Sequence, residues 1–363
     1  MSNPRIISQA KLAEALGLSR ATISYALSDS SRVALETRER VRRASAKLGY
    51  RPNIQARQLR RSRSNLVGVA CGPITDSYQA QLIDALEREL WSRGLLMLTR
   101  SIMLGSPEEA WERTLEFVDN RACGIIFQCY SDLHARLAET YPRMFALVNI
   151  GTPNPNLPSI SCDFDAAGRA VAQHLLSLGR KRWATNVTKS RFDSGQHLKT
   201  RAFVQAAMDA GLPAPVEVLL EGDYFESHLG EYGQIVAQSI MQRHPDVDAI
   251  YFSCDDIAQS GMAWLQREGY RVPEDVAVVG FNDAPYAASG VVPLTTIRQP
   301  AQLFARLAVE MLIEQMENDN QLSLPGREIE CELVIRKSTD PAYRPPQPQA
   351  PPGSLRFLNQ QTI

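Results

Sequence analysis

Residues 8–27, S-Q-A-K-L-A-E-A-L-G-L-S-R-A-T-I-S-Y-A-L, constrain the fold of this chain more than any other segment. The pattern predicts two short helices joined by the turn Gly17-Leu18-Ser19. Ser8 and Ser19 stand where helix N-caps are expected, because a serine side chain can accept a hydrogen bond from a free N–H of the first turn. Two helices at this spacing form a helix-turn-helix, whose second helix enters the DNA major groove.

The second helix has one apolar and one polar face. At 100° per residue, Ile23, Ala26 and Leu27 share the face that should pack on the neighbouring helices. The expected packing partners are Leu12, Ala13 and Leu16 before it, and Val41, Ala44 and Leu48 after it. The candidate residues for the major groove lie at the start and on the outer face of the helix: Ser19, Arg20, Ala21, Thr22, Ser24 and Tyr25.

The charge of the chain is divided unevenly. Residues 1–65 hold 14 Lys and Arg against 4 Asp and Glu, a net charge of +10, whereas the whole chain carries −1. A basic head on an acidic body is typical of a protein that binds nucleic acid with one domain only. The alternative is an Arg-rich helical surface that contacts only solvent.

Composition excludes several classes of protein. The chain has no run of about 18 apolar residues and no apolar leader, so we expect neither a membrane span nor export, but a cytoplasmic, nucleoid-associated protein. The six cysteines make no C-x-x-C pair, which favours reduced, buried thiols over disulfides or a metal site. The sequence therefore predicts no cofactor and no metal.

A third helix is expected over residues 36–48, ending at Gly49. After Tyr50-Arg51-Pro52 comes N-I-Q-A-R-Q-L-R-R, a helix too short to be stable alone, which we expect to fold only against DNA and a partner chain. The candidate residues for the minor groove in this hinge are Asn53, Ala56, Arg57, Leu59 and Arg60.

Apolar strand patterns then alternate with amphipathic helix patterns as far as residue 281. Continuous apolar strands between such helices predict parallel sheets covered on both faces, here in two sets that form two lobes with a ligand cleft between them. We therefore predict an all-α helix-turn-helix head (1–51), a hinge and linker (52–65) and a two-lobed α/β body (66–340). The Pro-rich end (341–363) is expected to be disordered.

Several motifs resemble those of the lac repressor/gal repressor family of bacterial transcriptional regulators. They include L-G-L-S-R-A-T-I-S-Y-A-L and L-G-Y-R-P-N-x-x-A-R-Q-L in the head, and H-L-L-S-L-G-R-K-R, R-V-P-E-D-V-A-V-V-G-F-N-D and P-L-T-T-I-R-Q-P in the body. The match spans about residues 5–338. It implies a periplasmic-binding-protein-like body and a homodimer that binds a pseudo-palindromic operator. In such a dimer each recognition helix contacts the major groove of one half-site, and Leu59 inserts into the minor groove at the centre. It also implies a small effector between the lobes, with helix 301–318 returning to the first lobe and strand 328–336 to the second.

Departures from the family pattern bear on specificity. Tyr25 stands where relatives often have Arg or His, and it cannot make the bidentate contact that Arg makes to guanine. Arg20 can supply that contact or hold a phosphate instead, and Tyr25 can equally pack against the backbone. The effector candidates by the same resemblance are Tyr78, Gln79, Lys199, Cys254, Asp255, Asn282 and Asp283. The alternative for Asp255 and Asp283 is that they cap the elements after their strands. We expect Lys199, Asn282 and Tyr78 to hold a small polar ligand, a sugar or a sugar acid.

Rival functions have less support. The adjacent Asp255 and Asp256 point about 100° apart on a helix and do not form an acid/base pair. The histidines at 134, 174, 197, 228 and 244 lack ligand spacing, and no phosphate loop or nucleophile motif occurs. A transport-type binding protein shares the two-lobed body but carries no DNA-binding head. A regulator of this fold controlled by a protein partner, without a small effector, remains the alternative.

Overall fold

The computed structural model describes residues 7–27, 30–50, 64–102, 105–128, 133–153, 157–188, 196–220, 229–320 and 325–345. The chain divides into two compact units, residues 1–65 and 66–363, called here the head and the body. The candidate hinge residues Asn53, Ala56, Arg57, Leu59 and Arg60 lie outside the described residues, as does the Pro-rich end from residue 346.

The described residues of the head form three helices, α1 (Gln9–Leu16), α2 (Arg20–Leu27) and α3 (Leu35–Lys47). The Ser8 side chain caps α1 by accepting from the Lys11 N–H, and Gly17 ends it with a positive φ of 63° that a glycine adopts without strain. Leu12, Ile23, Ala26 and Val41 are fully buried between the helices, as the helical phase of the sequence predicts.

One predicted packing residue of the head is wrong. Leu48 is 38% exposed and does not join the core, whereas Leu16, Leu27 and Ala44 pack against it. Leu48 is the C-cap of α3, where the chain leaves the helix, so a helical phase no longer fixes its direction. Ser45 is buried instead, and its hydroxyl donates to the Tyr50 carbonyl at 3.0 Å.

The first lobe of the body contains a six-stranded sheet in the order β11-β5-β4-β3-β1-β2, in which every neighbouring pair is parallel. Its strands are β1 (Leu66–Cys71), β2 (Leu96–Ser101), β3 (Gly124–Phe127), β4 (Ala146–Ile150), β5 (Ser159–Cys162) and β11 (Arg327–Ile329). Its helices are α5 (Ser77–Ser92), α6 (Pro107–Asp119), α7 (Leu133–Thr140) and α13 (Ala301–Glu317). β1, β3, β4 and β5 are almost entirely buried, which explains the apolar sequences of β1, β3 and most of β4.

The second lobe repeats this plan with the order β12-β10-β9-β8-β6-β7. Its strands are β6 (Trp183–Thr188), β7 (Val216–Leu220), β8 (Ala249–Tyr251), β9 (Ala277–Asn282), β10 (Thr295–Arg298) and β12 (Glu332–Val334). Its helices are α8 (Phe164–Ser177), α9 (Gln196–Asp209), α11 (Leu229–Arg243), α12 (Asp255–Arg267) and the short 3₁₀ helix η1 (Pro285–Ala288). Among the strands that the structure describes, only β12 runs antiparallel to its neighbour, β10.

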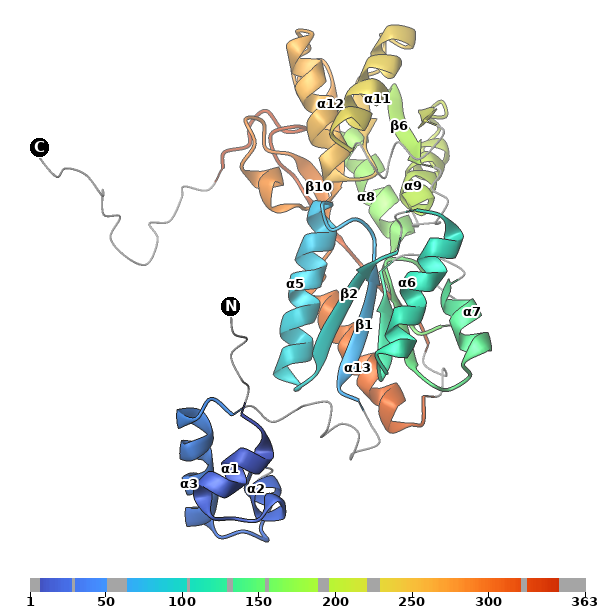
Figure 1. Ribbon diagram of the computed structural model, residues 1–363. Helices are drawn as coiled ribbons and strands as arrows, with labels where there is room; N and C mark the ends of the chain where they lie inside the picture. The colour runs from blue at the N-terminus through green and yellow to red at the C-terminus, as the bar shows by residue number, and fades with distance from the viewer. Residues whose placement is uncertain are drawn as a thin grey trace, which may run out of the picture. The chain divides into compact units, whose positions relative to one another are not determined.

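The chain crosses between the lobes at three points: after β5, after β10, and between β11 and β12. Figure 1 shows the second crossing plainly, because the orange-red α13 lies among the blue and cyan elements of the first lobe, beside α5. The predicted return of helix 301–318 to the first lobe agrees with this position. Both lobes are therefore discontinuous in sequence.

One prediction about a strand is wrong, and one observed strand has no counterpart in the sequence pattern. Residues 328–336 do not form one strand of the second lobe, since β11 joins the first sheet and β12 the second, with Glu330 and Cys331 between them. β5 was not expected at all, because S-I-S-C is short and half polar, and its pairing with β4 and β11 is long-range. In the described part of the chain, no helix is both long and apolar enough to cross a membrane.

Candidate DNA-reading helix and inter-lobe cluster

The start of α2 is held in place by polar contacts. The Ser19 hydroxyl accepts from the Thr22 N–H at 3.0 Å and lies 2.8 Å from the Thr22 hydroxyl. The Gln9 side chain of α1 donates to the Arg20 carbonyl at 3.1 Å, which ties the first helix to the second. These bonds fix the direction of α2, and they engage the hydroxyls of Ser19 and Thr22, two of the base-reading candidates.

The outer face of α2 carries the predicted base-reading side chains. Arg20 and Ala21 are exposed, Thr22 and Ser24 are half-buried, and Tyr25 is 39% exposed. The buried face, Ile23 and Ala26, packs on Leu12 and Val41. The structure thus brings the six candidate residues onto one helix start and one solvent-facing surface, the arrangement that major-groove contact requires.

Tyr25 has a partner that the sequence reasoning missed. Arg32 donates to the Tyr25 hydroxyl at 3.1 Å, and its guanidinium lies 5.3 Å from the centre of the tyrosine ring. A cation over the ring and a donor on the hydroxyl restrict the orientation of Tyr25. The signal for Arg32 was weak, since it lies beyond the end of α2 in a region predicted only as connection.

In the body, side chains from both lobes meet around one lysine. We call Asp76, Tyr78, Lys199, Cys254 and Phe281 the inter-lobe cluster. Asp76 and Tyr78 belong to the start of α5 in the first lobe, whereas the other three belong to α9, α12 and β9 of the second. Ser77, between them, donates to Asp256 of the second lobe at 3.0 Å, so the two lobes touch here directly.

Lys199 is buried at the centre of this cluster, with 6% of its surface exposed. Its ammonium donates to the Ser253 carbonyl at 3.3 Å and lies 4.3 Å from the centre of the Phe281 ring. Burial lowers the pKa of Lys199, and its electrostatic interactions with Cys254, Asp76, Cys162 and Asp255 oppose that shift. The ammonium of Lys199, which we expect to bind a ligand, therefore already interacts with several groups of the protein itself.

Asp76 supplies a carboxylate from the opposite lobe. It caps α5 by accepting from the Gln79 N–H at 2.8 Å. Burial raises the pKa of Asp76 to about 6, while the Gln79 N–H and Lys199 act in the opposite direction. Sequence reasoning missed Asp76, although its position one residue before α5 is typical of an N-cap. The cluster thus faces a buried ammonium of one lobe with a buried carboxylate of the other.

Tyr78 completes the first-lobe side of the cluster. Its side chain is buried, and its hydroxyl has no hydrogen-bond partner within the described part of the chain. Burial raises its pKa well above the ordinary value for tyrosine. Within the described part of the chain, the side-chain oxygen of Gln79 likewise has no hydrogen-bond partner. A neutral hydroxyl and an amide are groups that can meet a ligand's polar atoms without adding charge.

Asn282, the last residue of β9, and Asp283, which follows it, have positive φ angles of 117° and 56°, which are unusual for residues other than glycine. The Asn282 oxygen accepts from Gln299 at 2.7 Å. The Asp283 carboxylate accepts from Arg336 at 2.7 Å and from Arg298 at 2.6 Å. Both oxygens of Asp283 are therefore occupied by the second lobe.

Asp255 is fully buried and also occupied. One carboxylate oxygen accepts from the Thr296 hydroxyl at 2.6 Å, and the other from the Ala284 N–H at 2.6 Å. Burial raises the pKa of Asp255 to about 7, against the lowering effect of these two donors. Its neighbour Cys254 is the N-cap of α12, makes no side-chain capping bond, and has a thiol pKa raised by burial.

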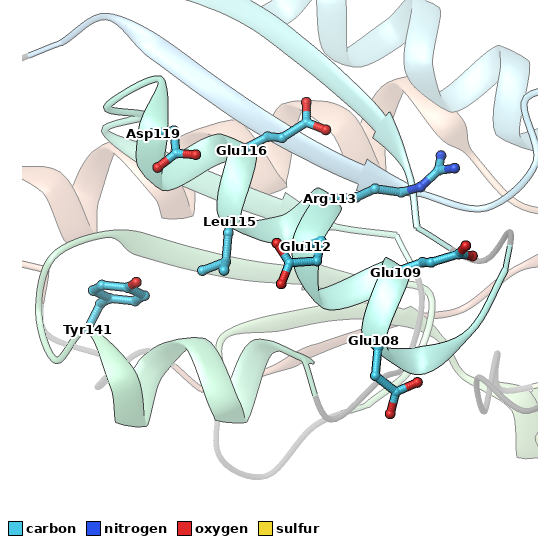
Figure 2. A pocket seen from close by; sticks show the side chains of 8 residues that line it. All are labelled: Glu108, Glu109, Glu112, Arg113, Leu115, Glu116, Asp119 and Tyr141. Atoms are coloured by element: carbon cyan, nitrogen blue, oxygen red, sulfur yellow. The ribbon is translucent and has the colours of Figure 1, made fainter.

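A separate cavity of about 530 Å³ lies on the outer side of α6. Figure 2 shows its side chains fanning out from α6, with Tyr141 facing them from beyond the end of α7. The lining residues are Glu108, Glu109, Glu112, Arg113, Leu115, Glu116, Asp119 and Tyr141. Most of these carboxylates are exposed, and Glu116 pairs with Arg100. None of the predicted effector residues lines this cavity.

Comparison with known proteins agrees with both units. Residues 10–53 match the family model "Bacterial regulatory proteins, lacI family", and residues 153–339 match "Periplasmic binding protein-like domain". The HTH-type transcriptional regulator reg1 of Streptomyces lividans is 32% identical, over 91% of this chain and 96% of its own length.

Solved structures share the fold. The lac repressor dimer bound to operator and the anti-inducer ONPF is 22% identical and covers 92% of this chain and 99% of its own, with a TM-score of 0.81. A complex of the transcriptional regulator CelR with cellobiose is 24% identical with the same coverage and a TM-score of 0.65. From its helix-turn-helix head, its two-lobed body and these matches, we conclude that the chain belongs to the lacI family of bacterial regulatory proteins.

Proposed function

We propose that this protein is a cytoplasmic, sequence-specific repressor that binds a pseudo-palindromic operator as a homodimer. The observation that carries the proposal is the solvent-facing surface of α2, with exposed Arg20, Ala21 and Tyr25 on a helix whose other face is the core of a basic head. Two recognition helices related by a two-fold axis would read two inverted half-sites. The similar lac repressor was solved as a dimer on its operator.

Within each half-site, Arg20 and Tyr25 have different roles in this proposal. Arg20 is free to make a bidentate contact with a guanine. Tyr25, restricted by Arg32, offers one hydroxyl and an apolar ring edge, which suits a thymine methyl. The hinge residues Asn53, Ala56, Arg57, Leu59 and Arg60 are proposed to contact the minor groove at the centre of the operator, where an inserted Leu59 would bend the duplex.

The effector is proposed to bind at the inter-lobe cluster, held by Lys199, Asn282 and Tyr78. A ligand there meets an ammonium, a carboxylate with a raised pKa and an unpaired tyrosine hydroxyl. Because Asp76 and Asp255 offset the charge of Lys199, a neutral molecule with several hydroxyls fits this site better than an anion. CelR, which is similar in structure, was solved with the disaccharide cellobiose.

Asp255 and Asp283 are proposed to support the site rather than to touch the ligand. Their carboxylate oxygens already accept hydrogen bonds from Thr296, Ala284, Arg298 and Arg336. They hold the turn after β9 and thereby orient Asn282 and Phe281. Carboxylates that are paired within the second lobe are also compatible with a regulator controlled by a protein partner, which is the second candidate function.

The test begins with selection of operators by the full chain from random duplex DNA. An enriched inverted repeat, lost in Arg20→Ala, supports sequence-specific reading, whereas enrichment of no motif contradicts it. The selected duplex is then titrated in the presence of neutral sugars, sugar acids and nucleosides. A neutral sugar that changes operator affinity supports the inter-lobe proposal, and no response to any compound favours the protein-controlled alternative.

A further inference from the structure

Two of the three lobe crossings carry a cysteine. Cys162 is the last residue of β5, immediately before the chain enters the second lobe. Cys331 lies between β11 and β12, where the chain passes from the first sheet to the second. The remaining crossing, after β10, begins with Gln299 and Pro300 and has no thiol. Both sulfurs therefore sit on the segments about which the lobes would move.

The sheet brings these two thiols together. β11 runs parallel to β5 with Ile329 opposite Cys162, and Cys331 follows two residues later. The Cys331 side chain lies near enough to Cys162 to raise the pKa of its thiol. Cys331 also donates to the Ile329 carbonyl at 3.4 Å, and Cys162 to the Asp163 carbonyl at 3.6 Å. Both side chains are buried, at 1% and 5% exposure.

No other pair of this kind occurs in the described part of the chain. Cys71 and Cys123 each donate to a backbone carbonyl, of Arg100 and Leu66 respectively. No group of three His, Cys, Asp or Glu that could hold a metal ion exists among the described residues, so a third ligand for a soft metal is missing beside the two sulfurs. The chemistry left to two neighbouring thiols is oxidation to a disulfide.

We propose that Cys162 and Cys331 form a dithiol that a hydroperoxide converts to a disulfide, joining the first lobe crossing to the third. One sulfur attacks the peroxide, whose O–O bond breaks, giving a sulfenic acid and one molecule of water or alcohol. The second sulfur displaces the sulfenic oxygen as water and forms the S–S bond. Two electrons pass from the sulfurs to the peroxide, and both thiol protons end in the two leaving molecules.

The surroundings of the two sulfurs predict that formation of the sulfenic acid is slow and that formation of the disulfide is fast. The neighbouring Cys331 and burial both raise the pKa of Cys162, which keeps it protonated and weakly nucleophilic. The second step needs only a neighbouring sulfur, which Cys331 supplies. The ammonium of Lys199 lowers the pKa of Cys162 in part, and Tyr78 is near both sulfurs.

A disulfide here would connect the end of β5 to the segment between β11 and β12. Two crossings that only non-covalent contacts connect in the reduced protein would then be joined covalently, so rotation of the lobes would be restricted. If the proposed function is right, the oxidised protein should respond less to its effector. This consequence rests on the proposed function, whereas the formation of the disulfide does not.

The test exposes the folded full chain to hydrogen peroxide, blocks remaining thiols with iodoacetamide, and maps tryptic peptides by mass spectrometry without reduction. Residues 144–169 and 328–336 each form a tryptic peptide with a single cysteine. We expect these peptides to be joined, with a mass about 2 Da below their sum, at roughly tenfold or greater yield than any other pair of cysteine peptides.

Two variants make the result specific. Cys331→Ser should abolish the cross-link and leave Cys162 as a sulfenic acid that dimedone captures, while Cys123→Ser should leave the cross-link unchanged. The proposal is overturned if peroxide oxidises Cys71 or Cys123 while Cys162 and Cys331 remain alkylated on unfolding, or if the cross-link joins other cysteines. Should Cys331→Ser fail to fold, the peptide map of the wild-type chain decides alone. Loss of operator binding in both redox states, with the cross-link present, would refute the proposed function but not the dithiol.

Discussion

Replacing Asp255 by asparagine tests how the second lobe holds its buried carboxylate. In the wild-type protein the Thr296 hydroxyl and the Ala284 N–H donate to Asp255. An asparagine oxygen can still accept from Ala284, and its amide can donate to a rotated Thr296 hydroxyl. Asp255→Asn therefore keeps both contacts and removes only the buried ionisable group.

The sign of the effect follows from the pKa of Asp255, which burial raises from 3.8 to about 7 in the folded protein. Between those values the folded state holds a proton that the unfolded state has released, so the free energy of unfolding falls as pH rises through this window. From about pH 5 to pH 8 the loss for Asp255 alone amounts to roughly 2–3 kcal/mol. Asp76, with a pKa raised by burial to about 6, adds a smaller loss of the same sign.

Urea unfolding at a series of pH values measures this directly. All four tryptophans, at 91, 111, 183 and 264, belong to the body, so their fluorescence reports its unfolding without a contribution from the head. Asp255→Asn should flatten the fall in stability between pH 5 and 8, while Glu268→Gln, an exposed change at the end of the same helix, should leave it intact. An equally steep fall in Asp255→Asn would refute the reasoning.

Three further outcomes are expected. Gly280→Ala should destabilise the body by about 1–3 kcal/mol in the same assay, because its Cβ would lie 2.3 Å from the Asp255 carboxylate; unchanged stability would contradict the close approach. Tyr25→Ala should relax base preference within each half-site at a cost of about 1–3 kcal/mol in operator binding, measured by competition with mutated duplexes. Leu59→Ala should weaken operator binding far more than non-specific binding and reduce DNA bending; an unchanged bend in a gel-shift phasing assay would rule out insertion of Leu59 into the duplex.

The head shows how far local sequence reasoning reaches. The phase of Ile23 and Ala26, the caps at Ser8 and Ser19 and the turn at Gly17 all depend on neighbours within a few residues, and the structure confirms them. The prediction that Leu48 packs in the core is wrong because the chain leaves its helix at that residue. The contact of Arg32 with Tyr25 depends on a loop whose path no periodicity describes.

The inter-lobe cluster shows what such reasoning cannot reach. Lys199 was expected to offer its charge to a ligand, but its burial against Phe281 and Ser253 joins segments more than fifty residues apart. The ion pair of Asp283 with Arg336 and the strand break at Cys331 are equally long-range. The alternation of strands and helices predicted the two lobes, because each strand-helix unit is local in sequence. It could not predict which polar groups of different units form hydrogen bonds or ion pairs with one another.

The most direct test of the central claim is a titration of the selected operator with the full chain, with and without the best compound from the ligand panel. In wild type, saturating compound should change operator affinity by about tenfold or more, as coupling of two sites through a two-state body requires. In Lys199→Met, affinity without compound should be unchanged and the response to the compound lost. An equal response in both proteins would contradict the account, because the ligand would then act without the inter-lobe lysine.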